Sequence, residues 1–261
     1  MMFHIRLMTS NVWGDYFGNP VRGRDRILGS VYPRYAPDFL GFQEMTPAWW
    51  KSELCHLLAS RYQEAAADTR GKTNYTPLFY DSQRFELLEC IWDLYHEPLD
   101  ASKGFTGGIF RSKADGYTLA VFCTHFWWKT GAEHDKIRTE NAEQLIRAMK
   151  NVKKRYNCPV FFFGDLNCTC SSQAWKLLNS CGWETAFQRT ADHSPEDSLH
   201  GDPVYDSKGI PHGTVAAGTV DNSIDHIGVP ASVSVIKHRT VTDQDALDAT
   251  DHSPVYADIS F

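Results

Sequence analysis

The first third of the chain alternates between two patterns of apolar residues. Residues 3–7 alternate apolar and polar side chains, as a half-buried strand does, and the pattern ends at Ser10 and Asn11. Later apolar residues recur at helical spacing, with Pro33 near the end of one run and Pro47 at the start of another. These patterns predict a strand at 3–10, a helix at 22–35, a strand at 38–43 and a helix at 47–58.

The middle of the chain is richer in strands. Short apolar runs follow one another without an intervening helix, which favours antiparallel pairing over repeated βαβ units. We expect these strands at 62–66, 77–80, 85–94, 107–111 and 117–124.

The last third returns to mixed elements. Ser171 or Ser172 is the expected N-cap of one helix, and residues 185–211 lack periodicity and are predicted to form a long surface loop. The pattern predicts helices at 133–156 and 172–181, and strands at 160–164, 224–229, 233–238 and 255–261.

Polar residues follow the predicted strands at several separate points. A carboxylate placed at such a buried position is costly unless it is paired or bound to metal. Any one of these residues alone is better explained as a turn residue or a cap, but six segments together favour a functional site. The residues are Asn11, Glu44, His125, Asp165 with Asn167, Asp225, and Asp251 with His252.

This set of side chains suits the hydrolysis of a phosphate ester. The charged phosphoryl oxygens need a hard divalent cation, and a carboxylate such as Glu44 suits Mg²⁺ or Mn²⁺. Asp165 is placed to orient and deprotonate water, and Asn167 to donate to the phosphate or hold the metal's waters. His252, oriented by a carboxylate, and His125 are candidate donors to the oxyanion.

Composition narrows the class of protein. The 261 residues are 42% hydrophobic, and no linker or low-complexity tract divides them, so we expect one domain over 1–261. The net charge of −6 argues against a broadly basic surface that grips nucleic acid. The N-terminal residues resemble neither a signal peptide nor a membrane span, so the chain as given is expected to be cytoplasmic, although a removed signal would leave no trace.

Seven cysteines raise a zinc alternative to the carboxylate chemistry. Cys168 and Cys170 are spaced C-x-C rather than C-x2-C, and Cys158 lies at the other end of the strand, about 20 Å away. We therefore expect reduced thiols packed behind the site, without zinc. The loop histidines His193 and His200 have no ligand spacing and are expected to be exposed.

Short motifs around these residues resemble those of the endonuclease/exonuclease/phosphatase superfamily, which includes DNase I, abasic-site endonucleases, deadenylases, neutral sphingomyelinases and inositol-phosphate 5-phosphatases. They occur in the family's order over nearly the whole chain. The segments NYTPLFY at 74–80 and PHGTV at 211–215 resemble further family pieces. The main motifs are TSNVWG at Asn11, FLGFQEM at Glu44, TH at His125, GDLN at Asp165, SIDHI at Asp225 and TDHSPV at Asp251.

The resemblance implies a fold and a metal centre. The fold is a four-layered α/β/β/α sandwich, in which two mixed sheets face one another and helices cover the outside. Glu44 would be the main Mg²⁺ ligand, with Asn11 and Asp251 close to the metal.

The resemblance also implies roles for the remaining residues. Asp165 would activate the nucleophilic water, and Asn167 would bind the scissile phosphate. Asp225 would pair with His252, and His125 would be a further phosphate contact or proton donor.

Two departures from the family pattern bear on substrate binding. Asn74 stands where several members carry a glutamate that partners the active-site histidine, which weakens the case for His125 as a general acid. Asn74 and Arg138 are candidate substrate-binding residues, and after the TH motif the insert FWWKTGAEHDK precedes Arg138. Trp127 and Trp128 in it are candidates to stack on a sugar, base or lipid, or else to pack the loop against the sheet.

The sequence thus predicts a Mg²⁺-dependent, or Mn²⁺-dependent, phosphoesterase acting on a mono- or diester of a small molecule such as a sugar, an inositol or a lipid headgroup. A single-strand nuclease or deadenylase-like exonuclease is the alternative, so nucleic acid remains a possible partner. A non-catalytic module of the same fold is a third reading, and the presence of Glu44, Asp165 and His252 argues against it. No protein partner is indicated.

Overall fold

Two six-stranded sheets form the centre of the computed structural model, which describes residues 3–66, 75–96 and 100–261. The first sheet has the order β13-β14-β1-β2-β4-β3 and the second β5-β6-β7-β8-β12-β9. The first consists of β1 (His4–Asn11), β2 (Phe39–Gln43), β3 (Tyr62–Glu64), β4 (Leu78–Asp81), β13 (Ser234–Thr240) and β14 (Val255–Ser260). The second consists of β5 (Phe85–His96), β6 (Asp100–Ser112), β7 (Thr118–His125), β8 (Val160–Asp165), β9 (Trp183–Thr185) and β12 (Asp225–Pro230).

Both sheets are mixed. β1 and β2 run parallel in the first sheet, as β7 and β8 do in the second, and the other neighbouring strands run antiparallel. The antiparallel pairing predicted for the middle of the chain is therefore confirmed for β5, β6 and β7.

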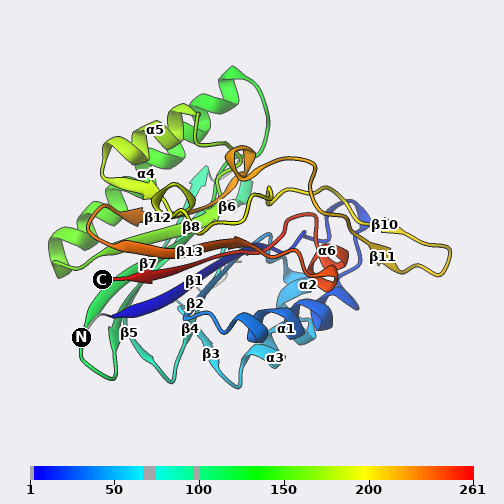
Figure 1. The fold of residues 1–261 in the computed structure, drawn as a ribbon, viewed down its shortest axis with the longest axis horizontal. Coiled ribbons are helices and arrows are strands. Elements are labelled where there is room, and N and C mark those ends of the chain that lie inside the picture. Colours follow the sequence, from blue (N-terminus) through cyan, green and yellow to red (C-terminus); the bar gives the residue numbers. More distant parts are fainter. Residues whose placement is uncertain (1–2, 67–74, 97–99) are drawn as a thin grey trace.

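Helices cover the outer faces of the sheets, which completes the four layers that the sequence predicted. Figure 1 shows α4 and α5 on one side of the sheets and α1 and α3 on the other. The helices are α1 (Arg24–Tyr35), α2 (Pro47–Trp50), α3 (Glu53–Leu58), α4 (Ala132–Tyr156), α5 (Gln173–Ser180) and α6 (Gln244–Ala249). Three short 3-10 turns lie at Tyr16–Gly18, Phe187–Arg189 and Val220–Asn222. No helix among the described residues combines the length and the apolarity that a membrane span requires.

The core between the sheets is rich in aromatic side chains. Phe39 and Phe85 pack together with Phe110, and Phe161 and Phe163 join the same buried cluster from β8. Aliphatic side chains from both sheets, such as Leu7, Val121 and Ile259, complete this buried cluster.

One glycine is required just before the predicted catalytic aspartate. Gly164 has a φ of +152°, and a Cβ there would lie 1.9 Å from the carbonyl oxygen of Thr124. Only glycine allows β7 and β8 to approach this closely, and the approach brings their last residues side by side.

The structure differs from the predicted elements in four places. The helix predicted at 47–58 is two helices, because Ser52 adopts an extended conformation and its hydroxyl accepts from the Leu54 N–H to start α3. The strand predicted at 107–111 is longer, since β6 begins at Asp100. The strand β9 and the helix α6 are too short to give a periodic signal.

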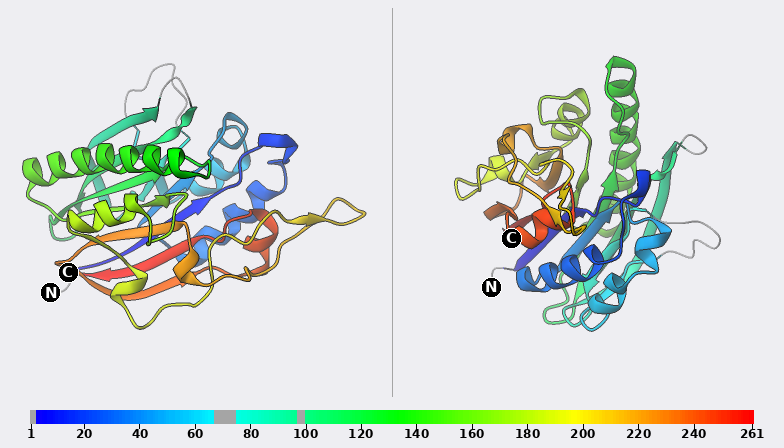
Figure 2. Two further views of the ribbon diagram at one scale, coloured as in Figure 1. Left: turned by 90° about the horizontal axis from the view of Figure 1, so that it is seen from above. Right: turned by 90° about the vertical axis from the view of Figure 1, so that its right-hand side faces the viewer.

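The predicted loop at 185–211 contains the start of an ordered arm. β10 (Val204–Tyr205) and β11 (Pro211–His212) pair antiparallel, and the hairpin they form projects from the body of the protein in Figures 1 and 2. The two chain ends lie together at the opposite end, where Phe3 and Phe261 exchange backbone hydrogen bonds.

Candidate active site

The predicted polar residues come together at one end of the two sheets. Asn11 ends β1, and Glu44 directly follows the neighbouring strand β2. In the second sheet, Asp165 at the end of β8 is paired with His125 on one side and with Asp225 on the other. The ends of parallel strands share an edge, and β12 runs antiparallel, so its first residue meets the same edge.

Backbone strain is concentrated at this edge. Among the described residues, five that are not glycine have a positive φ, and Ala36 and Asn157 simply end helices. The other three are Trp13 (54°), Glu44 (61°) and Asn167 (49°). Strain of this kind persists where the surrounding structure fixes a side chain in a particular direction.

Asp165 lies at the centre of a hydrogen-bond network. Its carboxylate accepts from the Asn11 amide (3.1 Å) and from the Asn167 backbone N–H (2.8 Å), and it lies 3.4 Å from Nε2 of His125. Burial alone would raise the pKa of Asp165, but the contact with His125 and the nearby charge of His252 lower it below its usual value. The carboxylate is therefore ionised and able to accept a proton.

Asp225 and His252 form a buried ion pair. The Nδ1 of His252 donates to Oδ2 of Asp225 over 2.8 Å, and the Ser198 hydroxyl donates to the same oxygen over 2.6 Å. Burial would lower the pKa of His252, but Asp225, with Asp251 beside it, raises it well above the ordinary value. His252 is thus held as a cation and aimed by its partner.

Ser198 is a site residue that the sequence prediction missed. It lies in the segment predicted to be a surface loop, yet its side chain is fully buried. Its neighbour His200 was expected to be exposed, and this prediction is wrong. Both ring nitrogens of His200 are buried, and its backbone N–H donates to the carbonyl of Asp251 over 3.0 Å. Burial and the charge of His252 lower the pKa of His200 to about 4.

Two carboxylates at this edge fit a divalent cation. Burial raises the pKa of Asp251 to about 6 and the charge of Glu44 contributes to the rise, so the two carboxylates repel each other. One oxygen of Glu44 accepts from the Gly14 N–H (2.8 Å), which fixes the carboxylate. Asn11 is fixed as well, since its Oδ1 accepts from the Trp13 N–H. A cation between such groups removes the repulsion, and carboxylate and amide oxygens are the ligands that Mg²⁺ prefers.

A second group of ligand-type atoms lies next to these carboxylates. One atom from each of Asp165, Asp225 and His252 lies within 4.8 Å of the others. Within this group His252 Nδ1 is bonded to Asp225, and both oxygens of Asp165 accept hydrogen bonds from outside it, from Asn11 and Asn167. Oδ1 of Asp225 is buried without a hydrogen-bond partner among the described residues. These bonds suit proton handling better than metal ligation.

Lys103 is a second residue that the sequence prediction missed. It lies on β6, is 4% exposed, and places its ammonium 2.9 Å from Nε2 and 3.2 Å from Nδ1 of His125. A lysine ammonium can only donate, so a ring nitrogen of His125 must accept. The site therefore holds the buried amino group of Lys103 against His125, in addition to the cation at His252.

The predicted substrate-binding residues are placed differently from one another. Trp127 is 7% exposed and its indole donates to His134 over 2.9 Å, so it packs the loop, whereas Trp128 is 52% exposed. Arg138 is buried and donates to the carbonyl oxygens of Trp127 and Lys129, which fixes the loop. The predicted residue Asn74 lies outside the described residues.

The cysteines lie where packing was predicted. Cys168 accepts a hydrogen bond from Ser172, and its carbonyl lies 2.8 Å from the His226 ring. Burial raises the pKa of the Cys168 thiol to about 11 and that of Cys170 to about 12. Both thiols are therefore protonated near neutral pH, and neither belongs to a metal-binding group among the described residues.

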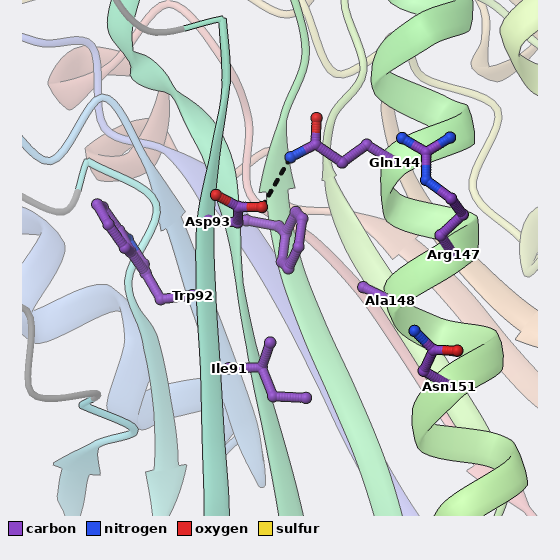
Figure 3. A pocket seen from close by; sticks show the side chains of 8 residues that line it. Ile91, Trp92, Asp93, Gln144, Arg147, Ala148 and Asn151 are labelled. Atoms are coloured by element: carbon purple, nitrogen blue, oxygen red, sulfur yellow. Dashed lines mark hydrogen bonds between the residues drawn. The ribbon is translucent and has the colours of Figure 1, made fainter.

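A hollow of about 420 Å³ lies elsewhere, between β5 and α4. Figure 3 shows Asp93 on its strand side bonded to Gln144 on the helix, at 2.9 Å. Ile91, Phe105 and Ala148 supply its apolar lining. The hollow shares no residue with the strand-end site.

Comparison with known proteins supports the architecture. No protein-family model matches the chain, and no curated protein matches it by sequence. Solved structures do match over nearly the whole chain. An endonuclease/exonuclease/phosphatase from Bacteroides vulgatus superposes with a TM-score of 0.78 at 21% identity, covering 98% of each chain. The chain has the fold of this superfamily.

Two further structures show how widely this superfamily fold is used. A mannosyl-6-phosphatase from Bacteroides thetaiotaomicron matches with a TM-score of 0.77 at 20% identity, over 98% of this chain and 100% of that one. The human Nocturnin catalytic domain, solved with a bound sulfate anion, matches with a TM-score of 0.72 at 18% identity, over 99% and 94%. At these identities the comparison concerns the fold.

Proposed function

We propose that this protein is a metal-dependent phosphoesterase that hydrolyses its substrate by direct attack of water. The observation that carries the proposal is the meeting of Asp165, the Asp225–His252 ion pair and the Glu44–Asp251 carboxylates at one sheet edge. These groups come from four separate parts of the chain. Together they supply a base, a held cation and a metal site, which are the requirements of phosphate ester hydrolysis.

Asp165 accepts the proton of the attacking water. Its pKa is lowered, so it is ionised near neutral pH, and the bonds from Asn11 and Asn167 hold its orientation. The side-chain amide of Asn167 donates to the Phe126 carbonyl (3.1 Å), which holds this residue at the rim beside the phosphate.

The cations stabilise the negative charge of the phosphoryl group. His252, held by Asp225, donates to a phosphate oxygen, and Lys103 lends positive charge through His125. Such preorganised donors contribute most where water is excluded, and all four side chains are buried.

Glu44 holds the divalent metal, with Asp251 and Asn11 beside it. We propose Mg²⁺, with Mn²⁺ as a substitute, because these oxygen ligands are hard. When bound, the metal polarises a phosphoryl oxygen and neutralises its charge.

The substrate is a phosphorylated small molecule. The net charge of −6 does not favour a long nucleic acid, whose phosphates would require a basic track. A structural relative, the mannosyl-6-phosphatase, is named for a small phosphorylated substrate.

Substitution of the proposed base tests the function. Asp165→Asn should lower kcat/KM for phosphate esters by at least about 100-fold, because the amide cannot accept the proton. Sugar phosphates, inositol phosphates, a phosphocholine ester and a single-stranded oligonucleotide would be assayed with Mg²⁺ and with Mn²⁺. Ser171→Ala, at an exposed position on the loop after β8, is the matched control and should retain full activity. Wild-type turnover by Asp165→Asn would refute the assigned role.

A further inference from the structure

The loop after β7 is hydrogen-bonded to Asp165, the proposed base, and to Asn167, the residue proposed to bind the phosphate. The Phe126 N–H donates to the carbonyl of Asp165 (3.0 Å), and the Phe126 carbonyl accepts from the Asn167 amide (3.1 Å). On the other side, the Trp127 N–H donates to Asn141 (3.0 Å). The backbone that carries Trp128 therefore has a defined position beside the site.

Trp128 is exposed although the residues around it are anchored. Its side chain is 52% exposed, whereas those of Phe126 and Trp127 are buried. The Lys129 ammonium lies 5.7 Å from the centre of the Trp128 ring, on which it forms a cation–π contact. A tryptophan fixed in this way offers a large flat surface at little cost in conformational entropy.

A second exposed apolar side chain is anchored to the other side of the site. Leu199 is 42% exposed, and its backbone forms a β-bridge with His252. The preceding residue, Ser198, donates to Asp225, and the following residue, His200, donates to the Asp251 carbonyl.

The segments that carry these two side chains are attached to the two strands that flank the strand of Asp165. The base ends β8, whose neighbours in the sheet are β7 and β12. Trp128 follows β7, and Leu199 is tied through Ser198 to Asp225, the first residue of β12. Neighbouring strands lie about 4.8 Å apart, so the two flanking strands are separated by roughly 10 Å.

We propose, resting on the phosphoesterase function above, that the alcohol portion of the substrate carries a flat aromatic ring, which stacks on Trp128 and contacts Leu199. Trp128 and Leu199 thereby determine specificity, while the phosphate is held by the buried groups. The polar alcohol of a simple sugar phosphate fits these walls less well.

The test compares esters whose leaving groups differ in shape but little in reactivity. The esters are 2-phenylethyl, 2-cyclohexylethyl and glycerol phosphates and glucose 6-phosphate, each also prepared as its methyl diester. For the wild-type protein with Mg²⁺, kcat/KM for the phenylethyl ester should exceed that for the glycerol ester by about tenfold. It should exceed that for the cyclohexylethyl ester by about threefold, since stacking adds about 0.5–1.5 kcal/mol to area burial.

Substitutions of Trp128 and Leu199 test whether these two residues cause the preference for the phenylethyl ester. Trp128→Ala should raise KM for the phenylethyl ester by about tenfold, with kcat and the glycerol ester changed less than about twofold. Trp128→Phe should restore most of the affinity, and Leu199→Ala should give a smaller rise in KM. Leu57→Ala, at an equally exposed leucine on α3, is the control and should change neither ester.

Three results would overturn the proposal. A wild-type preference for the glycerol or glucose ester would do so, as would a Trp128→Ala variant that binds the phenylethyl ester as well as wild type. Equal loss of activity on every ester in Trp128→Ala would assign the residue a structural role. In each of these three cases the phosphoesterase function would still hold, provided that wild type hydrolyses the esters and Asp165→Asn does not. If wild type hydrolyses none of the esters, both the phosphoesterase function and this inference are refuted.

Discussion

Asp225 accepts two hydrogen bonds on a single oxygen, one of them from His252, and it sets the orientation and the charge of that histidine. Asp225→Asn should lower kcat by about 100-fold, because an amide does not hold the imidazole as a cation. Ser198→Ala removes only the other bond to that oxygen and should cost less, about tenfold or below. Steady-state kinetics at saturating Mg²⁺ measure both, and equal activity of Asp225→Asn and wild type would contradict the assignment.

We propose that Lys103, whose Nζ lies 2.9 Å from His125, supplies a buried positive charge there. Lys103→Met keeps the length of the side chain but removes the ammonium, so we expect kcat/KM to fall by about tenfold or more, since hydrogen bonds to charged groups contribute about 1.5–3 kcal/mol. Lys103→Arg keeps the charge and should recover part of the loss. An unchanged kcat/KM in the methionine variant would show that the lysine does not take part.

At the residue scale, the sequence identified the site residues at strand ends and missed those on a neighbouring strand or in the long loop. Asp165 and Asn11 could be predicted because a strand pattern stops just before them. Lys103 could not, because its position depends on the pairing of Gly104 with His125 across two strands. Ser198 and His200 could not, because a segment without periodicity gives no indication of what it packs against.

Among the elements, α5 offers a direct test of a local prediction. The sequence left Ser171 and Ser172 as alternative N-caps, and the structure assigns the cap to Ser172, whose hydroxyl accepts from the Trp175 N–H at 3.1 Å. Ser172→Ala should lower the free energy of unfolding by about 1 kcal/mol. Ser171→Ala should change it little, because that side chain is exposed. Urea unfolding of both variants measures the difference, and equal effects would contradict the cap.

The predicted elements were most accurate where a pattern is long. The helix predicted at 133–156 matches α4 to within one residue, because its apolar side recurs over several turns. The helix predicted at 47–58 was wrong in its middle, where the cap at Ser52 outweighs a continuous apolar pattern. α6 has six residues and was missed, since so short a helix depends on its contacts with the rest of the protein.

The stability of the whole molecule should depend on pH through His238. This side chain is 3% exposed, and burial, together with the charges of His193, His226 and Arg239, lowers its pKa from 6.5 to about 3. Between these two values the unfolded chain binds a proton at this histidine that the folded protein does not. The titration of His238 therefore leaves the free energy of unfolding unchanged above pH 6.5. It lowers this free energy as the pH decreases toward 3, by up to about 1.4 kcal/mol per pH unit.

His238→Gln isolates this contribution. Over pH 4–6 the unfolding free energy of the variant should depend less steeply on pH than that of wild type, by the equivalent of about one proton. The buried histidine His200 remains in both proteins and contributes equally to both slopes, because it is not among the groups that shift the pKa of His238. Identical slopes would contradict the assignment.

At the scale of the molecule, the sequence predicted the fold but not the substrate. The order of motifs along the chain predicted two facing mixed sheets, and the structure confirms them. The order of motifs could not predict the substrate, because proteins with this fold act on different substrates. Trp128 and Leu199, which we propose determine specificity, are exposed and come from segments without a regular pattern.

The most direct test of the central claim is metal-dependent ester hydrolysis by the purified protein. The ester panel would be assayed after removal of divalent cations with EDTA, and again after addition of Mg²⁺ or Mn²⁺, with Glu44→Ala beside wild type. We predict hydrolysis that is lost on chelation, restored by either cation in wild type, and restored poorly in Glu44→Ala. Hydrolysis that persists unchanged in EDTA, or its absence under every condition, would contradict the account.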